Sequence, residues 1–279
     1  MMILAFSNGW GVAAALAATA SYAVLALASW RRQQQATHVQ PVGVVHRVPQ
    51  VLLALAWLLH GAVLAEGLLG APPRFGFGPA LSITVWLVLT VYAIESRLFP
   101  RLPAHWVLAV LGGTAVLVAL VFPGSTYPTI ASPWLPLHWA LGLASYGLFA
   151  AAVVHGWLMT RAERAMRSAT QTEPGLPLMT LERLTFRFVE AGFALLSATL
   201  LVGWVFAEQL YGPRLVGMWN HKTVFSVLAW LTFALLLVGR ARLGWRGGKA
   251  VRVLYLGSGL LLLGYVGSRF VLEVVLGRT

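Results

Sequence analysis

Eight long apolar runs recur along the sequence and take up most of its length. They fall at about 10–30, 49–69, 79–95, 104–122, 137–160, 187–210, 221–240 and 253–275. As helices, these runs suit the ~30 Å hydrocarbon core of a bilayer, and the third is the shortest. Of the 279 residues, 59% are hydrophobic and only 10% are charged, which lies outside the range of water-soluble domains. The sequence therefore predicts an all-α integral membrane protein, an eight-transmembrane-helix bundle forming a single transmembrane domain over residues 1–279.

The first run could in principle belong to a cleaved signal peptide. Such a peptide begins with a basic segment and has a short apolar centre. Here residues 1–5 carry no basic side chain, and the run from Trp10 to Trp30 is long enough to cross the membrane. We expect a permanent helix.

The basic residues are distributed very unevenly between alternate loops. Fifteen of the twenty follow the first, third, fifth and seventh runs: Arg31, Arg32, Arg47, Arg97, Arg101, Arg161, Arg164, Arg167, Arg183, Arg187, Arg240, Arg242, Arg246, Lys249 and Arg252. Cytoplasmic loops are enriched in lysine and arginine, so both termini are predicted on the non-cytoplasmic side. The net charge of +12 is then a sign of membrane topology. The lipid bilayer is the expected partner, and nucleic acid is not.

Two residue types are missing, and their absence restricts the chemistry. There is no cysteine, which excludes disulfides and thiolate metal sites, and all eight acidic residues are glutamates. Without aspartate, phospho-aspartate pumps and most magnesium-phosphate sites are excluded. No nucleophile with a base at a recognisable spacing is present, so we do not predict an enzyme.

Three of the seven histidines are predicted at or beneath the non-cytoplasmic face. His138 opens the fifth run and His221 opens the seventh, while His60 lies ~17 Å along the second run, just past the midplane. Neutral imidazole is a ligand for heme iron, and an ionisable residue at the depth of His60 suggests function. The alternatives are a hydrogen-bonded core histidine at position 60 and helix-capping residues at positions 138 and 221.

Two cationic residues are predicted near the same face. Lys222 follows His221, and Arg269 lies in the last run, four residues before Glu273. Either cation could meet an anionic ligand such as the propionates of heme, while an i, i+4 ion pair with Glu273 is the structural alternative for Arg269.

The order of several motifs resembles the membrane proteins of cytochrome c assembly, in particular the eight-helix branch with CcsA-like, HemX-like and YpjD-like members. The matching stretches are LHWALGLASYGLFAAAVVHGWLMTRAER at 137–164, LPLMTLERLTFRFVEAGFALLSATLLVGWVFA at 176–207, HKTVFSVLAWLTFALLLVGRARLGWRGGKAVR at 221–252 and GYVGSRFVLEVVL at 264–276. The resemblance covers the helices of 123–279 well. It reaches the N-terminal helices of 1–122 through His60.

This resemblance implies a tryptophan-rich outer segment that presents heme, flanked by histidines that ligate the iron. Trp219 and Lys222 match a Trp-Asp-Pro-Lys-Glu core, whereas Asn220, His221 and Thr223 differ from it. His138 matches the first outer histidine of the family. A second one, expected near the end of the last helix, has no counterpart, and His221 is our candidate for its replacement.

The sequence thus favours a heme-binding or heme-handling inner-membrane protein related to cytochrome c biogenesis. Its expected pocket faces outward and uses His60 and His138 as iron ligands, with His221, Trp219, Lys222 and Arg269 around the heme. Other cytochrome assembly components are expected partners. Two alternatives remain open: an accessory or transport component for divalent cations or another small solute, without heme, and a scaffold without a ligand.

Overall fold

The computed structural model describes residues 9–35, 47–70, 74–98, 105–126, 134–167, 177–211 and 221–276. Almost all of them are helical. The chain divides into two compact units, one formed by 1–98 with 102–128 and the other by 99–101 with 129–279.

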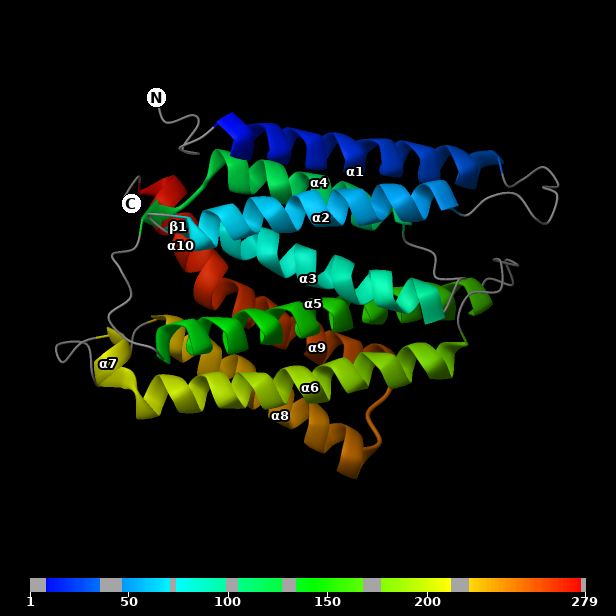
Figure 1. Ribbon diagram of the computed structural model, residues 1–279. Coiled ribbons are helices and arrows are strands. Elements are labelled where there is room, and N and C mark those ends of the chain that lie inside the picture. The colour runs from blue at the N-terminus through cyan, green and yellow to red at the C-terminus, as the bar shows by residue number, and fades with distance from the viewer. Residues whose placement is uncertain are drawn as a thin grey trace. The chain divides into compact units, whose positions relative to one another are not determined.

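The first unit consists of four helices and one short β-ladder (Figure 1). The helices are α1 (Gly9–Gln35), α2 (Arg47–Leu69), α3 (Phe77–Leu98) and α4 (His105–Val121). Strands β1 (Arg74–Phe75) and β2 (Ser125–Thr126) pair antiparallel. This ladder ties the chain entering α3 to the chain leaving α4.

Small residues bring the helices of the first unit close together. Ala15 and Ala18 of α1 are fully buried, and α1 packs against both α2 and α4. Gly112 of α4 leaves room for Tyr22, because a Cβ there would lie 2.9 Å from the Tyr22 ring. Without a hydrophobic drive between helices in lipid, such close approach is what holds a bundle together.

The described part of the second unit contains four long helices and several short helical segments. Its elements are α5 (Trp134–Arg167), α6 (Leu178–Val205), α7 (Ala207–Tyr211), α8 (His221–Leu243) and α9 (Gly247–Leu262), followed by the π-turn η1 (Leu263–Gly267), α10 (Ser268–Phe270) and the π-turn η2 (Val271–Val275). Helix α5 packs against α6 and α9, and α8 packs against α6 and α9.

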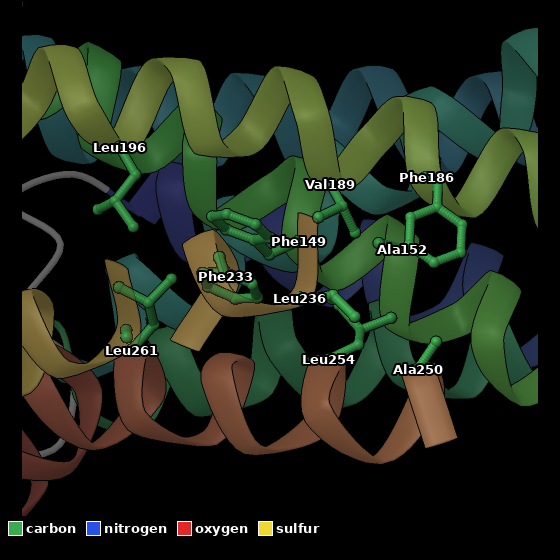
Figure 2. Close-up of a cluster of buried hydrophobic side chains, with 11 residues drawn as sticks. Phe149, Ala152, Phe186, Val189, Leu196, Phe233, Leu236, Ala250, Leu254 and Leu261 are labelled. Carbon is green, nitrogen blue, oxygen red and sulfur yellow. The ribbon is translucent and has the colours of Figure 1, made fainter. Parts of the chain in front are cut away.

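A stacked pair of phenylalanines lies at the centre of the second unit. The rings of Phe149 on α5 and Phe233 on α8 are nearly parallel, with centroids 3.8 Å apart. Figure 2 shows them among buried side chains from α5, α6, α8 and α9. Gly192 and Gly257 let α6 and α9 approach this pair, since a Cβ on Gly257 would lie 2.8 Å from the Phe233 ring.

A tight hairpin joins α8 to α9. Gly244 and Gly247 both have positive φ, at 64° and 56°, where other residues are strained. Between them Trp245 folds back over Gly239, whose Cβ position lies 2.5 Å from the indole ring. The Trp245 amide also donates to the Gly239 carbonyl at 3.1 Å. The hairpin is therefore fixed by backbone geometry and by ring packing together.

Seven of the described helices are long and apolar enough to cross a membrane, in agreement with a multi-pass helical membrane protein. The run expected at 104–122 forms α4, but its 17 residues make it a shorter apolar helix. The run at 79–95, expected to be the shortest, forms a helix of 22 residues. The eight-span count, the side of the termini and the single domain over 1–279 stay predictions.

The packing of α9 on Phe233 can be tested with two glycines on the same helix. Gly257→Ala should destabilise the protein by about 1–3 kcal/mol, because the added methyl group overlaps a buried ring that is itself held by Phe149. Gly259→Ala is the matched control, since nothing lies within 4 Å of its Cβ position. Thermal unfolding in detergent should show a lower Tm for Gly257→Ala only. Equal Tm values would contradict the packing described.

Candidate functional site

His60 lies fully buried inside the first unit, at the junction of three helices. Its Nδ1 is 3.2 Å from the hydroxyl of Tyr22 on α1, and its Nε2 is 2.8 Å from the hydroxyl of Ser82 on α3. The Tyr22 and His60 rings meet edge to face. Neutral imidazole has one donor and one acceptor nitrogen, and here both have a partner. This arrangement matches the alternative given for position 60 from the sequence, a hydrogen-bonded core histidine.

His138 lies in the first turns of α5, in the second unit, and its side chain is partly buried. Its ring packs on the end of α6, where a Cβ on Gly203 would be 3.1 Å from Cε1, and it hydrogen-bonds to the backbone of Thr199. Nearby, Trp134 stacks on Phe206 at 4.0 Å. Glycine at position 203 is what allows the imidazole to lie against the helix backbone.

Helix register places further candidates at the same end of the second unit. Helices α5 and α9 run antiparallel, because Tyr146 donates to the Leu261 carbonyl at 2.6 Å while Gly156 faces Leu254. The chain beyond Leu261 therefore returns toward the level of His138. We call this region, formed by the start of α5, the end of α6, the start of α8 and the segment from η1 to α10, the His138 end.

Lys222 and Arg269 both belong to the His138 end. The Lys222 ammonium lies 5.4 Å from the centre of the Tyr265 ring, which fixes the start of α8 against η1. His221, the first residue of α8, is exposed, and Arg269 is partly buried in α10. Trp219 lies outside the described residues, as does the side chain of Glu273.

The candidates are thus divided between the two units. His138, His221, Lys222 and Arg269 share one end of the second unit, and His60 belongs to the first. A pocket joining His60 to His138 stays a prediction. Within the described ranges, no three His or Glu side chains form a group that could hold a metal ion.

Some contacts of these histidines were not anticipated from the sequence. Tyr22 and Ser82 are polar residues inside apolar runs, and that is the only sign of their role that the sequence offers. Gly203 gives no sign at all, because a glycine against a ring looks like any other glycine in a membrane helix. His155, which lies 17 residues after His138, donates from Nδ1 to the Ala151 carbonyl of its own helix and contacts Phe188.

The fold and the site candidates define a multi-pass helical membrane protein with imidazoles in two separate units. The chain belongs to the family described as Cytochrome C assembly protein, which it matches over residues 45–276. That match includes α2 with His60 as well as every candidate in the second unit. The family resemblance read from the C-terminal half is confirmed.

Individual relatives extend over different parts of the chain. The inner membrane protein YpjD of Escherichia coli (strain K12) is 28% identical over 231 residues, which is 80% of this chain and 84% of that protein. An uncharacterized 28.8 kDa protein of Azospirillum brasilense is 33% identical over 147 residues, 52% of this chain and 54% of its own. The cytochrome c biogenesis protein CcsA of Cyanophora paradoxa is 33% identical over 87 residues, 31% of this chain and 26% of its own. No solved structure matches the chain.

The hydrogen bonds of His60 predict a stability effect in the first unit. Ser82→Ala leaves one ring nitrogen of a fully buried imidazole without its partner, so we expect a loss of about 1–2 kcal/mol. Ser21→Ala is the control, because that exposed hydroxyl bonds only to Ala17 of its own helix. Thermal unfolding of both variants measures the difference. If Ser82→Ala unfolds at the same temperature as Ser21→Ala, the bond does not stabilise the unit.

Proposed function

We propose that this chain is a multi-pass protein of the bacterial inner membrane that binds or handles heme during cytochrome c biogenesis. The observation that carries the proposal is the position of His138, an imidazole seated on glycine backbone at one end of the second unit, in a chain of the cytochrome c assembly family. The relative in Cyanophora paradoxa is named a cytochrome c biogenesis protein, and the one in Escherichia coli an inner membrane protein.

The groups at the His138 end fit heme by their chemistry. Iron in heme takes imidazole as an axial ligand, and its propionates pair with cations. His138 would supply the ligand, His221 is a candidate for a second one, and Lys222 and Arg269 would receive the propionates. Trp219 is proposed to lie against the heme, as its match to the family core implies. All of these except Trp219 are described at one end of the same unit.

His60 has a different place in the proposal. It could ligate iron only if Tyr22 or Ser82 released a ring nitrogen, because both nitrogens are engaged. Exchanging a hydrogen bond for a metal ligand is feasible for a neutral imidazole but requires the three helices to move. We therefore place His138 first among the ligand candidates and His60 second.

In this proposal the protein carries and positions a cofactor and does not transform a substrate, so it is not an enzyme. Other cytochrome assembly components would receive or deliver the heme. The proposed topology has eight spans, with α4 as the fourth and both termini on the non-cytoplasmic side. In the second unit, the end opposite His138 carries most of the cations, which supports a cytoplasmic location for that end.

The proposal predicts heme in the purified protein. Full-length chain produced with ample heme should show a Soret absorption band, and His138→Ala should lower heme occupancy by roughly tenfold or more. His155→Ala is the matched control, because it lies 17 residues further along the same helix, ~26 Å away. Occupancy should also fall as the pH drops below about 6, since protonated imidazole cannot bind iron. A band unaffected by His138→Ala and His60→Ala would refute the assigned ligands.

The seat of His138 on α6 gives an independent test. Gly203→Val should displace the ring, because even a Cβ lies 3.1 Å from it, and heme occupancy should fall with the protein still folded. Gly259→Val serves as control, since nothing lies within 4 Å of its Cβ position. Absorption spectra of both variants, at equal protein concentration, give the comparison. Unchanged occupancy in Gly203→Val would argue against a ligand at position 138.

A further inference from the structure

The exposed face of α8 forms an apolar stripe that ends at an arginine. Its exposed side chains follow the helical period of three or four residues: Val224, Leu228, Leu231, Leu235 and Val238. The next position in the series is Arg242, which is exposed as well. Because the opposite face of α8 is buried against the other helices, this stripe is the surface that lipid chains would contact.

Helix α9 repeats the pattern in the opposite direction. It begins with the exposed cations Lys249 and Arg252 and continues with Tyr255, Leu256 and Leu262, which are exposed apolar or aromatic side chains. The two helices are joined by the hairpin around Trp245, so both stripes have their cations at the same level. Tryptophan at that level is typical of the membrane interface.

The cations of this hairpin differ in whether a carboxylate lies close to them. Arg240 and Arg246 each lie 3.8 Å from the same carboxylate oxygen of Glu182 on α6. Arg242, by contrast, has no ion-pair partner among the described residues.

Lys249 and Arg252 also lack a carboxylate within the described part of the chain. The Lys249 ammonium lies 4.2 Å from the centre of the Trp245 ring, and the Arg252 Nε donates to the Gly248 carbonyl at 3.2 Å. Neither contact neutralises a charge. The segment 240–252 carries five cations and no acid. Among the described residues, Glu182 and Glu163 approach it from neighbouring helices.

We propose that this hairpin binds an anionic phospholipid. The phosphate would lie among Arg242, Lys249 and Arg252, and the acyl chains would lie along the stripes that begin at Val238 and Tyr255. Charge complementarity selects an anion, and the apolar stripes directly adjoining the cations select a lipid over a soluble anion. The site lies at the opposite end of the second unit from His138, and it does not depend on heme.

The test uses the full chain purified in detergent, with dioleoyl phosphatidylglycerol as the anionic probe and dioleoyl phosphatidylcholine as the neutral one. Native mass spectrometry reports the ratio of the two lipids retained. Arg242→Gln/Arg252→Gln should lower retention of phosphatidylglycerol by tenfold or more, since each cation contributes about a fivefold effect. Arg183→Gln/Arg187→Gln removes the same charge from exposed positions on α6 and should change retention less than twofold.

Each other outcome contradicts the proposal. Equal losses in both double variants would show only a general attraction of a basic surface for anions, and no loss in either would show no site. Glycerol 3-phosphate in excess should not displace the lipid, because it lacks acyl chains, and displacement would mean that a soluble anion is bound instead. Equal Tm values of the variants and the unmodified chain confirm that the variants are folded. If Arg242→Gln/Arg252→Gln unfolds, the single variant Lys249→Gln replaces it and should lower retention of phosphatidylglycerol about fivefold.

Discussion

The second unit depends on the close approach of helix backbones to a pair of stacked rings. Phe149 and Phe233 occupy the centre, and the bare backbones at Gly192 and Gly257 let α6 and α9 come within contact of them. In lipid there is no hydrophobic gain from bringing helices together, so dispersion contacts at such distances have to supply the attraction. These contacts set the register of α5, α6, α8 and α9. Through that register they determine which residues share the His138 end and which share the hairpin end.

Hydrogen bonds between buried polar groups link the helices within each unit. The imidazole of His60 links α1, α2 and α3 in the first unit, and the hydroxyl of Tyr146 links α5 to the Leu261 carbonyl of α9 in the second. A buried polar group without a partner is costly in a low-dielectric interior, so each of these bonds specifies one arrangement of the helices. At the His138 end, a bond between the His138 ring and the backbone of Thr199 links α5 to α6.

Much of the fold could be predicted from hydrophobic patterning. Each expected run forms helix over most of its length. A stretch of about twenty apolar residues in lipid has to satisfy its backbone bonds internally. Helix ends were harder to predict: α6 begins at Leu178, well before the expected 187, since amphipathic turns extend beyond the apolar run. The lengths of α3 and α4 were also misjudged, because hydropathy does not show where a helix ends.

The candidate site could be predicted in part. Composition and depth singled out His60 and His138, and the structure supplies contacts for both. No pattern within one helix indicates its partners on another, which is why Tyr22, Ser82 and Gly203 were missed. The cations of the α8–α9 hairpin were read from the sequence only as a sign of topology. Their separation into two kinds depends on Glu182, which is about sixty residues away along the chain.

The two π-turns at the end of the second unit alter which way the last residues point. A π-turn holds one residue more than an α-turn spans, so every side chain beyond it is rotated by about 100° from its place on an uninterrupted helix. Arg269 comes after η1 and before η2, and it therefore faces a direction that a helical wheel drawn from Gly247 would assign to its neighbour. Deleting one residue within Leu263–Gly267 would let the segment close into ordinary α-helical turns with that guanidinium still facing its present side, because the π-turn already absorbs one extra residue.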